Sequence, residues 1–223
     1  GGGSLGGGGA ERQVVNLLRD LDRSRFEPVL YLVYRTGPLL AEVPADVPVF
    51  SFDQQRPRTG WSLILSKLPG QLRRDIIADL ARTLHRERID CVYDRTYHMT
   101  MLAAPACSKA HVPRVSTVVS DPKSDFDLQE RRFRYLKRRL LTQAYRSADR
   151  IVTVSDGVRE GLLREYAPPA HRVVTIYNPV DFDGIARRAL EPLPNEILSL
   201  FEGDRIQHVV AAGRLQVEKC FDQ

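Results

Sequence analysis

The chain has 223 residues and a hydrophobic fraction of 43%, which allows one large domain or a domain with part of a second. It has no run of about 18 apolar residues that could span a membrane. Its three scattered cysteines form no C-x-x-C pair, which argues against a disulfide framework and a zinc site. The net charge is +5, and eight cations lie within residues 131–150, which indicates an anionic partner. We expect a soluble, cytoplasmic protein without a metal site.

Strands and helices alternate along the chain. Apolar runs and helical spacing predict strands at 29–34, 47–52, 89–93, 114–119, 150–155, 173–177 and 207–212, and helices at 14–21, 72–84, 98–110, 128–146 and 158–167. Pro105 is expected to kink or break its helix, and Ser155 is suited to cap the helix that follows it. The alternation predicts an α/β fold with a Rossmann-like, doubly wound, mostly parallel sheet, whose ligands lie beyond the carboxyl ends of the strands.

The composition changes after Asn178, where prolines and short charged pieces separate the last predicted strand from the rest. We predict a first domain at residues 1–185 and, at 186–223, a linker and the start of a second, truncated α/β domain. A doubly wound domain normally has a strand just before a glycine-rich loop such as residues 5–9. That strand is expected to be missing here and to leave an unpaired gap in the centre of the sheet.

The tail carries two cations directly after the last predicted strand. Arg214 and Lys219 lie in a turn that leads toward an expected helix start. Two cations at the carboxyl end of a parallel strand, beside the amides of a helix start, are suited to bind a diphosphate. The alternative is that both are ordinary surface residues.

The first nine residues include seven glycines. One interpretation of residues 1–4 is a linker that is not native to the protein. The glycines formally match the G-x-G-x-x-G motif, but the match is weak because no strand precedes it. Residues 5–11 differ, because they lead directly into a helix. Gly8 and Gly9 would let the backbone approach an anionic ligand closely; the alternative is a flexible loop.

Three blocks together resemble glycosyltransferase family 4, whose members have two facing Rossmann-like domains, the GT-B architecture. The blocks are SLGGGGAER at 4–12, SADRIVTVS at 147–155 leading to IYNPVD at 176–181, and GRL at 213–215 with EK at 218–219. The resemblance covers nearly the whole chain. It implies that the chain is the amino-terminal domain with only the first strand of the donor-binding domain.

The resemblance also implies a function. Such enzymes transfer a sugar from a nucleotide-sugar to an acceptor hydroxyl with retention of configuration and without a required metal or cofactor. Arg214 and Lys219 then correspond to the cations that hold the donor diphosphate, with the catalytic demand of neutralising the leaving group. Gly8 and Gly9 correspond to the loop that faces the donor from the first domain. The catalytic residues themselves are not assigned, and the chain by itself is expected to be inactive.

Two departures from the family pattern concern the acceptor side and the phosphate loop. Where many members have a histidine after the fifth strand, this chain has Ser120 and Asp121, which could hydrogen-bond a sugar hydroxyl or act as turn and cap residues. Cys220 replaces the usual glycine after the phosphate-binding lysine. His98 follows a strand end, where lining the cleft and starting a helix are equally open roles.

The basic segment 131–146 combines dense arginine with Phe133, Leu136 and Leu140. A solvated helix face is one explanation. Interfacial binding to anionic lipid, on the inner face of the plasma membrane, is the other, and it would suit a lipid-linked acceptor.

The partners expected are a UDP- or GDP-sugar donor and a sugar or lipid-linked acceptor, in the synthesis of a surface polysaccharide, lipopolysaccharide or glycolipid. The alternative is a non-catalytic ligand-binding or interaction module with the same doubly wound fold. Nucleic-acid binding is the least favoured alternative, because the cations are not interleaved with aromatics and no binding motif is present.

Overall fold

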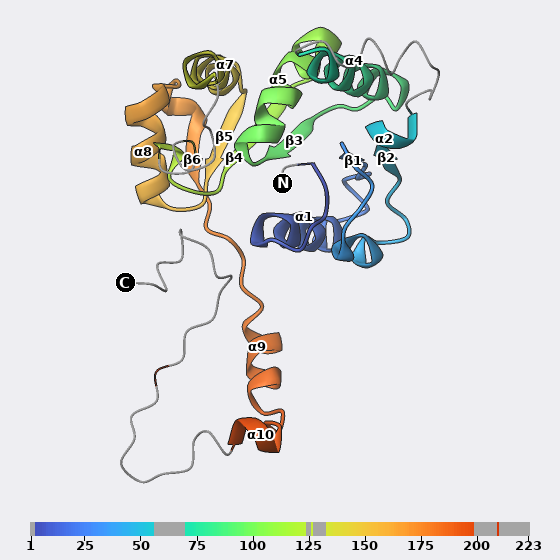
Figure 1. The fold of residues 1–223 in the computed structure, drawn as a ribbon, viewed down its shortest axis with the longest axis vertical. Coiled ribbons are helices and arrows are strands. Elements are labelled where there is room, and N and C mark those ends of the chain that lie inside the picture. The colour runs from blue at the N-terminus through green and yellow to red at the C-terminus, as the bar shows by residue number, and fades with distance from the viewer. Residues whose placement is uncertain (1–2, 56–69, 124–125, 127–132, 199–208, 210–223) are drawn as a thin grey trace. The chain divides into compact units, whose positions relative to one another are not determined.

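The computed structural model describes residues 3–55, 70–123, 126, 133–198 and 209 (Figure 1). The chain divides into two compact units, Gly1–Asn178 and Pro179–Gln223. The second unit contains α9 (Phe182–Ala189) and α10 (Asn195–Leu198) among its described residues. The expected strand at 207–212 lies outside the described residues. The division at residue 185 into an acceptor-side and a donor-side domain stays a prediction.

The first unit alternates strands and helices as the apolar pattern predicts. Its elements are α1 (Gly9–Asp20), β1 (Leu30–Leu32), the 3-10 helix η1 (Pro38–Glu42), β2 (Val49–Ser51), α2 (Phe52–Gln55), α4 (Gln71–Arg86), β3 (Val92–Arg95), α5 (Tyr97–Ala110), β4 (Arg114–Val118), α7 (Arg134–Arg146), β5 (Arg150–Thr153), α8 (Asp156–Tyr166), the 3-10 helix η2 (Ala170–Arg172) and β6 (Val173–Thr175).

All strand pairs are parallel. β1 pairs with β2, and β3, β4, β5 and β6 form a four-stranded sheet in that order (Figure 1). Parallel neighbours need crossover connections, and α5, α7 and α8 provide them between the four strands. The predicted Rossmann-like α/β fold is therefore confirmed.

The short β1–β2 pair is a separate sheet from the β3–β6 sheet. The amino-terminal segment contacts the residues that directly follow β1. The amides of Val33 and Tyr34 donate to the Gly3 carbonyl at 2.9 and 3.0 Å. The unpaired gap expected in the centre of the sheet stays a prediction.

The core consists of apolar side chains that helices pack against strands. Leu141 and Tyr145 of α7 and Leu162 of α8 are buried with Ile151 of β5 in one cluster. A second cluster joins α4 to α5, including Leu80. Each helix buries one apolar stripe, and each strand alternates its side chains between the two faces of the sheet. Because the strands are parallel, the polar residues that follow them lie together at the carboxyl edge of the sheet.

Helix α5 continues through Pro105 without a break. Proline removes the amide that would have donated to the carbonyl of Met101, four residues earlier. The guanidinium of Arg73 in α4 donates to that carbonyl instead, at 3.0 Å. The helix does not break at Pro105, because a side chain from the neighbouring helix supplies the missing donor, and the expected kink stays a prediction.

Helix α7 differs from the prediction in its start and its buried face. Phe133 has a φ of 55° and precedes the helix, and residues 128–132 of the predicted helix lie outside the described residues. The face with Leu141 and Tyr145 turns toward the core, whereas Phe133 is 75% and Leu136 is 55% exposed. The expected apolar stripe is thus largely on the surface.

Among the described residues, no helix combines the length and the apolar character that crossing a membrane requires.

Candidate functional site

The amino-terminal loop leads directly into the first turn of α1. Gly8 is the N-cap residue and has an extended backbone, and no side chain caps the helix. A Cβ at Gly9 would meet no atom within 4 Å, so the approach to this backbone is open. The Glu11 carboxylate lies against Gly8, within the space of a Cβ there. The helix dipole favours negative charge at this end of α1, where the Glu11 carboxylate already lies.

Gly37 holds the loop in place from the other side. Its φ is 120°, and a Cβ there would overlap the carbonyl of Leu5. The amide of Leu5 donates to the Thr36 carbonyl at 3.0 Å, and the side chain of Leu5 is buried with Val15 and Leu39. The glycine loop is therefore anchored on the segment after β1, and sequence reasoning did not single out Gly37.

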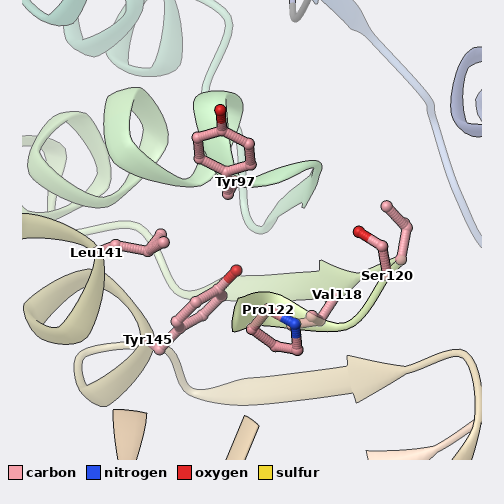
Figure 2. A pocket seen from close by; sticks show the side chains of 7 residues that line it. Tyr97, Val118, Ser120, Pro122, Leu141 and Tyr145 are labelled. Carbon is pink, nitrogen blue, oxygen red and sulfur yellow. The ribbon is translucent and has the colours of Figure 1, made fainter. Parts of the chain in front are cut away.

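Ser120 follows the end of β4 and lines a small cavity (Figure 2). Tyr97, Leu141 and Tyr145 line it too, and the Tyr145 hydroxyl points toward Tyr97, whose own hydroxyl points away. The cavity volume is about 10 Å³, which is room for about one water molecule and not for a sugar.

Asp121, next to Ser120 in the chain, and His98, in the first turn of α5, contact different elements. Asp121 Oδ1 would lie 2.6 Å from a Cβ at Gly161, so its carboxylate packs on α8. The His98 ring stacks at a tilt on that of Tyr97, with centroids 4.0 Å apart, at the start of α5. The structure thus does not gather Ser120, Asp121 and His98 into one cavity, and their role toward an acceptor stays a prediction.

A polar cluster that sequence reasoning missed lies at the same edge, and we call it the Arg95 cluster: Tyr93, Arg95, Thr96 and Asn178. The Arg95 guanidinium donates to the Tyr93 hydroxyl at 3.0 Å and to the Asn178 side-chain carbonyl at 2.8 Å. Asn178 follows β6, and β4 and β5 lie between β3 and β6 in the sheet. The Arg95 side chain and the segment after β6 therefore meet beyond the carboxyl ends of the middle strands.

A second polar group surrounds Asp156, the first residue of α8. Its carboxylate accepts from the Thr175 hydroxyl at 2.8 Å and the Tyr177 hydroxyl at 3.1 Å. The hydrogen bond to Asp156 raises the pKa of Tyr177. Ser155 caps the same helix, with its hydroxyl accepting from the Val158 amide at 3.3 Å, as predicted. These bonds fix the ends of β5 and β6 beside the Arg95 cluster.

A buried network stands behind the cluster. Asp94 accepts from Arg114 at 2.7 Å, from Ser116 at 2.7 Å and from Thr100 at 2.5 Å. The Asp94 and Arg114 side chains are only 3% and 2% exposed. A fully hydrogen-bonded pair of this kind ties β3, β4 and α5 rigidly together.

Arg214 and Lys219 lie outside the described residues, so the expected diphosphate contacts stay predictions. Within the described ranges, no three His, Cys, Asp or Glu side chains are grouped so that they could hold a metal ion.

Residues 7–183 match the model of the family described as Glycosyltransferase Family 4. The chain belongs to glycosyltransferase family 4. The match begins within the glycine loop and ends in α9, so it includes the whole carboxyl edge described above. Among curated proteins, none is significantly similar to the chain.

Solved glycosyltransferase structures resemble the chain in fold. Anabaena Alr3699/HepE in complex with UDP and glucose is 20% identical, with a TM-score of 0.59 over 86% of this chain and 46% of that one. The apo lipopolysaccharide outer core galactosyltransferase WaaB is 16% identical, with a TM-score of 0.52 over 78% and 43%. A glycosyltransferase from Rickettsia africae ESF-5 is 18% identical, with a TM-score of 0.55 over 88% and 46%. The chain spans less than half the length of each.

Proposed function

We propose that the protein is a hexosyltransferase that moves a sugar from a nucleotide-sugar donor to an acceptor hydroxyl with retention of configuration. The family match over residues 7–183 carries this proposal, because it includes the glycine loop and the strand ends. Two observations on similar folds support it: Alr3699/HepE binds UDP-glucose, and WaaB is a lipopolysaccharide galactosyltransferase. We place the reaction in the synthesis of a surface polysaccharide, lipopolysaccharide or glycolipid, without a required metal.

In this proposal the donor phosphates lie at the start of α1. Gly8 and Gly9 present uncapped amides, and the open space at Gly9 lets a phosphate oxygen approach them. We propose that Arg214 and Lys219 supply positive charge to the same diphosphate. Charge builds on the diphosphate as the glycosidic bond breaks, so these four residues act where transition-state stabilisation is needed. The chain alone is expected to be inactive.

The acceptor is a sugar or a lipid-linked saccharide, with Ser120, Asp121 and His98 as candidate contacts. Helix α7 provides a reason to favour a lipid. It has five cations and no acidic residue, and Tyr135 and Leu136 are 82% and 55% exposed on it. Exposed apolar side chains among cations fit the headgroup region of an anionic membrane. We propose a cytoplasmic protein that docks on the inner membrane face.

The direct test of the donor site is calorimetric titration of the protein with UDP and GDP. The double variant Arg214→Ala with Lys219→Ala should lose at least tenfold in affinity, because both removed charges contact the diphosphate. The matched control removes two other cations, Arg187 and Arg188, which lie in the last turn of α9. That control should bind like the wild type.

Equal affinity in the wild type and in the Arg214 and Lys219 double variant would contradict the phosphate role. Nucleotide binding without transfer to any acceptor by the whole protein would favour a non-catalytic binding module.

A further inference from the structure

The Arg95 side chain is held in place by neutral groups alone. Its two hydrogen-bond partners among the described residues, the Tyr93 hydroxyl and the Asn178 amide carbonyl, carry no charge. Some arginines of the first unit pair with carboxylates, as Arg114 does with Asp94 and Arg138 with Glu165, whereas others, such as Arg73 and Arg150, donate to backbone carbonyls. In the described part of the chain, Arg95 forms no ion pair. Hydrogen bonds therefore hold the guanidinium in position, but no carboxylate among the described residues neutralises its charge.

The nearest carboxylate in sequence is unavailable to Arg95. Asp94 already accepts from Arg114, Thr100 and Ser116. Adjacent residues of a strand point to opposite faces, so Asp94 is directed away from the Arg95 side chain. A guanidinium has five N–H donors. The two bonds leave one N–H on each terminal nitrogen of Arg95 for another ligand, besides the buried Nε–H.

The backbone after Arg95 is strained. Thr96 has φ of 73° and ψ of 143°, a conformation that a β-branched residue rarely adopts and that costs about 1–3 kcal/mol. Two atoms here, Arg95 Nε and Thr96 Oγ1, are buried with no hydrogen-bond partner among the described residues. Strain and unpaired buried polar atoms both reduce stability, and they occur together where a site is built for function.

The start of α5 adds to the positive potential. Thr96 is its N-cap residue, no side chain caps the helix, and α5 is 14 residues long. Its dipole places partial positive charge beside the Arg95 guanidinium. Three features therefore meet at one point of the carboxyl edge: an un-neutralised guanidinium, two unpaired polar atoms and an uncapped helix start.

We propose that Arg95 and Thr96 bind a phosphate group of the acceptor, so that the acceptor is a phosphorylated sugar or a lipid-linked sugar phosphate. The guanidinium binds phosphate oxygens through the N–H groups that Tyr93 and Asn178 leave open, and Asn178 acts as a positioning residue. This inference rests on the proposed transferase function. It separates an acceptor phosphate site at β3 and α5 from the donor diphosphate site at α1.

The test compares two probes and a neutral control on the 223-residue chain, by NMR titration. Glucose 1-phosphate represents the acceptor phosphate, UDP represents the donor, and glucose has no phosphate. Arg95→Ala should weaken glucose 1-phosphate binding at least tenfold and leave UDP unaffected. Arg95→Lys should give an intermediate loss, because it keeps the charge but not the planar fork.

The control variant is Arg150→Ala. Arg150 is exposed at the amino end of β5, on the opposite edge of the same sheet, and its guanidinium also donates to a neutral acceptor, the Asp149 carbonyl at 2.9 Å. It should bind both probes like the wild type. Melting temperatures of both variants test whether the fold is intact.

Three results would overturn the inference: glucose 1-phosphate binding that Arg95→Ala leaves unchanged, an equal loss in Arg150→Ala, or an equal loss for UDP in Arg95→Ala. The last would assign Arg95 to the donor. Absence of UDP binding in every variant would instead count against the proposed function and leave the Arg95 result standing.

Discussion

Position 37 requires glycine for two separate reasons. Its φ of 120° is strained for any other residue, and a Cβ would overlap the Leu5 carbonyl, which belongs to the backbone and cannot move alone. We expect Gly37→Ala to lower the free energy of unfolding by about 2–3 kcal/mol. Urea denaturation measures the change. Gly9→Ala is the control, since a Cβ at Gly9 meets nothing within 4 Å. Equal stability of Gly37→Ala and the wild type would contradict the description of the loop.

At Thr96 we expect a substitution to raise the free energy of unfolding, in contrast to Gly37→Ala. Glycine adopts positive φ without strain, so Thr96→Gly should raise the free energy of unfolding by about 1 kcal/mol, after the entropy that glycine adds to the unfolded chain is subtracted. Thermal denaturation tests this. A lower melting temperature would show that Thr96 is not strained in the folded protein.

At the scale of residues, the sequence was informative where the signal is local. Ser155 was predicted as a cap from its place between a strand and a helix, and it caps α8. Arg95 and Asn178 were missed because they are 83 positions apart and meet only through the strand order. The strain at Thr96 was also unpredictable, since nothing in the local sequence requires positive φ there.

Among the elements, α5 shows how a neighbouring helix compensates for a proline. Arg73→Ala should cost about 1–2 kcal/mol, because it leaves the Met101 carbonyl of α5 without its donor. In a Pro105→Ala background the restored amide of residue 105 can donate to the same carbonyl. The cost of Arg73→Ala should then fall by at least half. Denaturation of the four proteins of this double-mutant cycle measures the coupling, and additive effects would contradict the explanation.

The exposed face of α7 gives a prediction for membrane binding. Tyr135→Ala with Leu136→Ala should reduce flotation with anionic vesicles at least fivefold, and Arg139→Glu should do the same in a salt-dependent way. Phe26→Ala and Arg25→Glu are matched controls, because Arg25 lies over the Phe26 ring on another exposed segment, with 5.4 Å to its centroid. Binding that resists salt and all of these changes would contradict the docking surface. Tighter binding to duplex DNA or RNA would favour a nucleic acid instead.

The strands and most helices of the first unit followed from apolar periodicity, because burial on one face sets that period. The face of α7 did not. Phe133 and Leu136 have the spacing of a buried stripe, but Leu141 and Tyr145 occupy the core. Apolar periodicity identifies an apolar helix face. It does not show whether that face packs against the sheet or stays on the surface, which depends on the packing of the folded protein.

For the whole molecule, the parallel alternation predicted the doubly wound fold, and the carboxyl edge of the sheet holds the candidate site. The family was recognisable because blocks far apart in the chain occur in a fixed order, and residues 7–183 match it. The donor-side contacts of Arg214 and Lys219 could not be placed, since they lie outside the described residues. The strand order β3-β4-β5-β6, which brings Arg95 to Asn178, also could not be derived from the sequence.

We propose that a nucleoside diphosphate binds at the start of α1. Saturation-transfer NMR with UDP and GDP tests it most directly on the wild type, Gly9→Ala and Gly157→Ala. A Cβ meets no atom within 4 Å at either glycine, so both variants keep the fold, but only Gly9 faces the proposed phosphate. The account predicts nucleotide signals for the wild type and Gly157→Ala and their loss in Gly9→Ala. Equal signals in all three proteins, or none in the wild type, would contradict it.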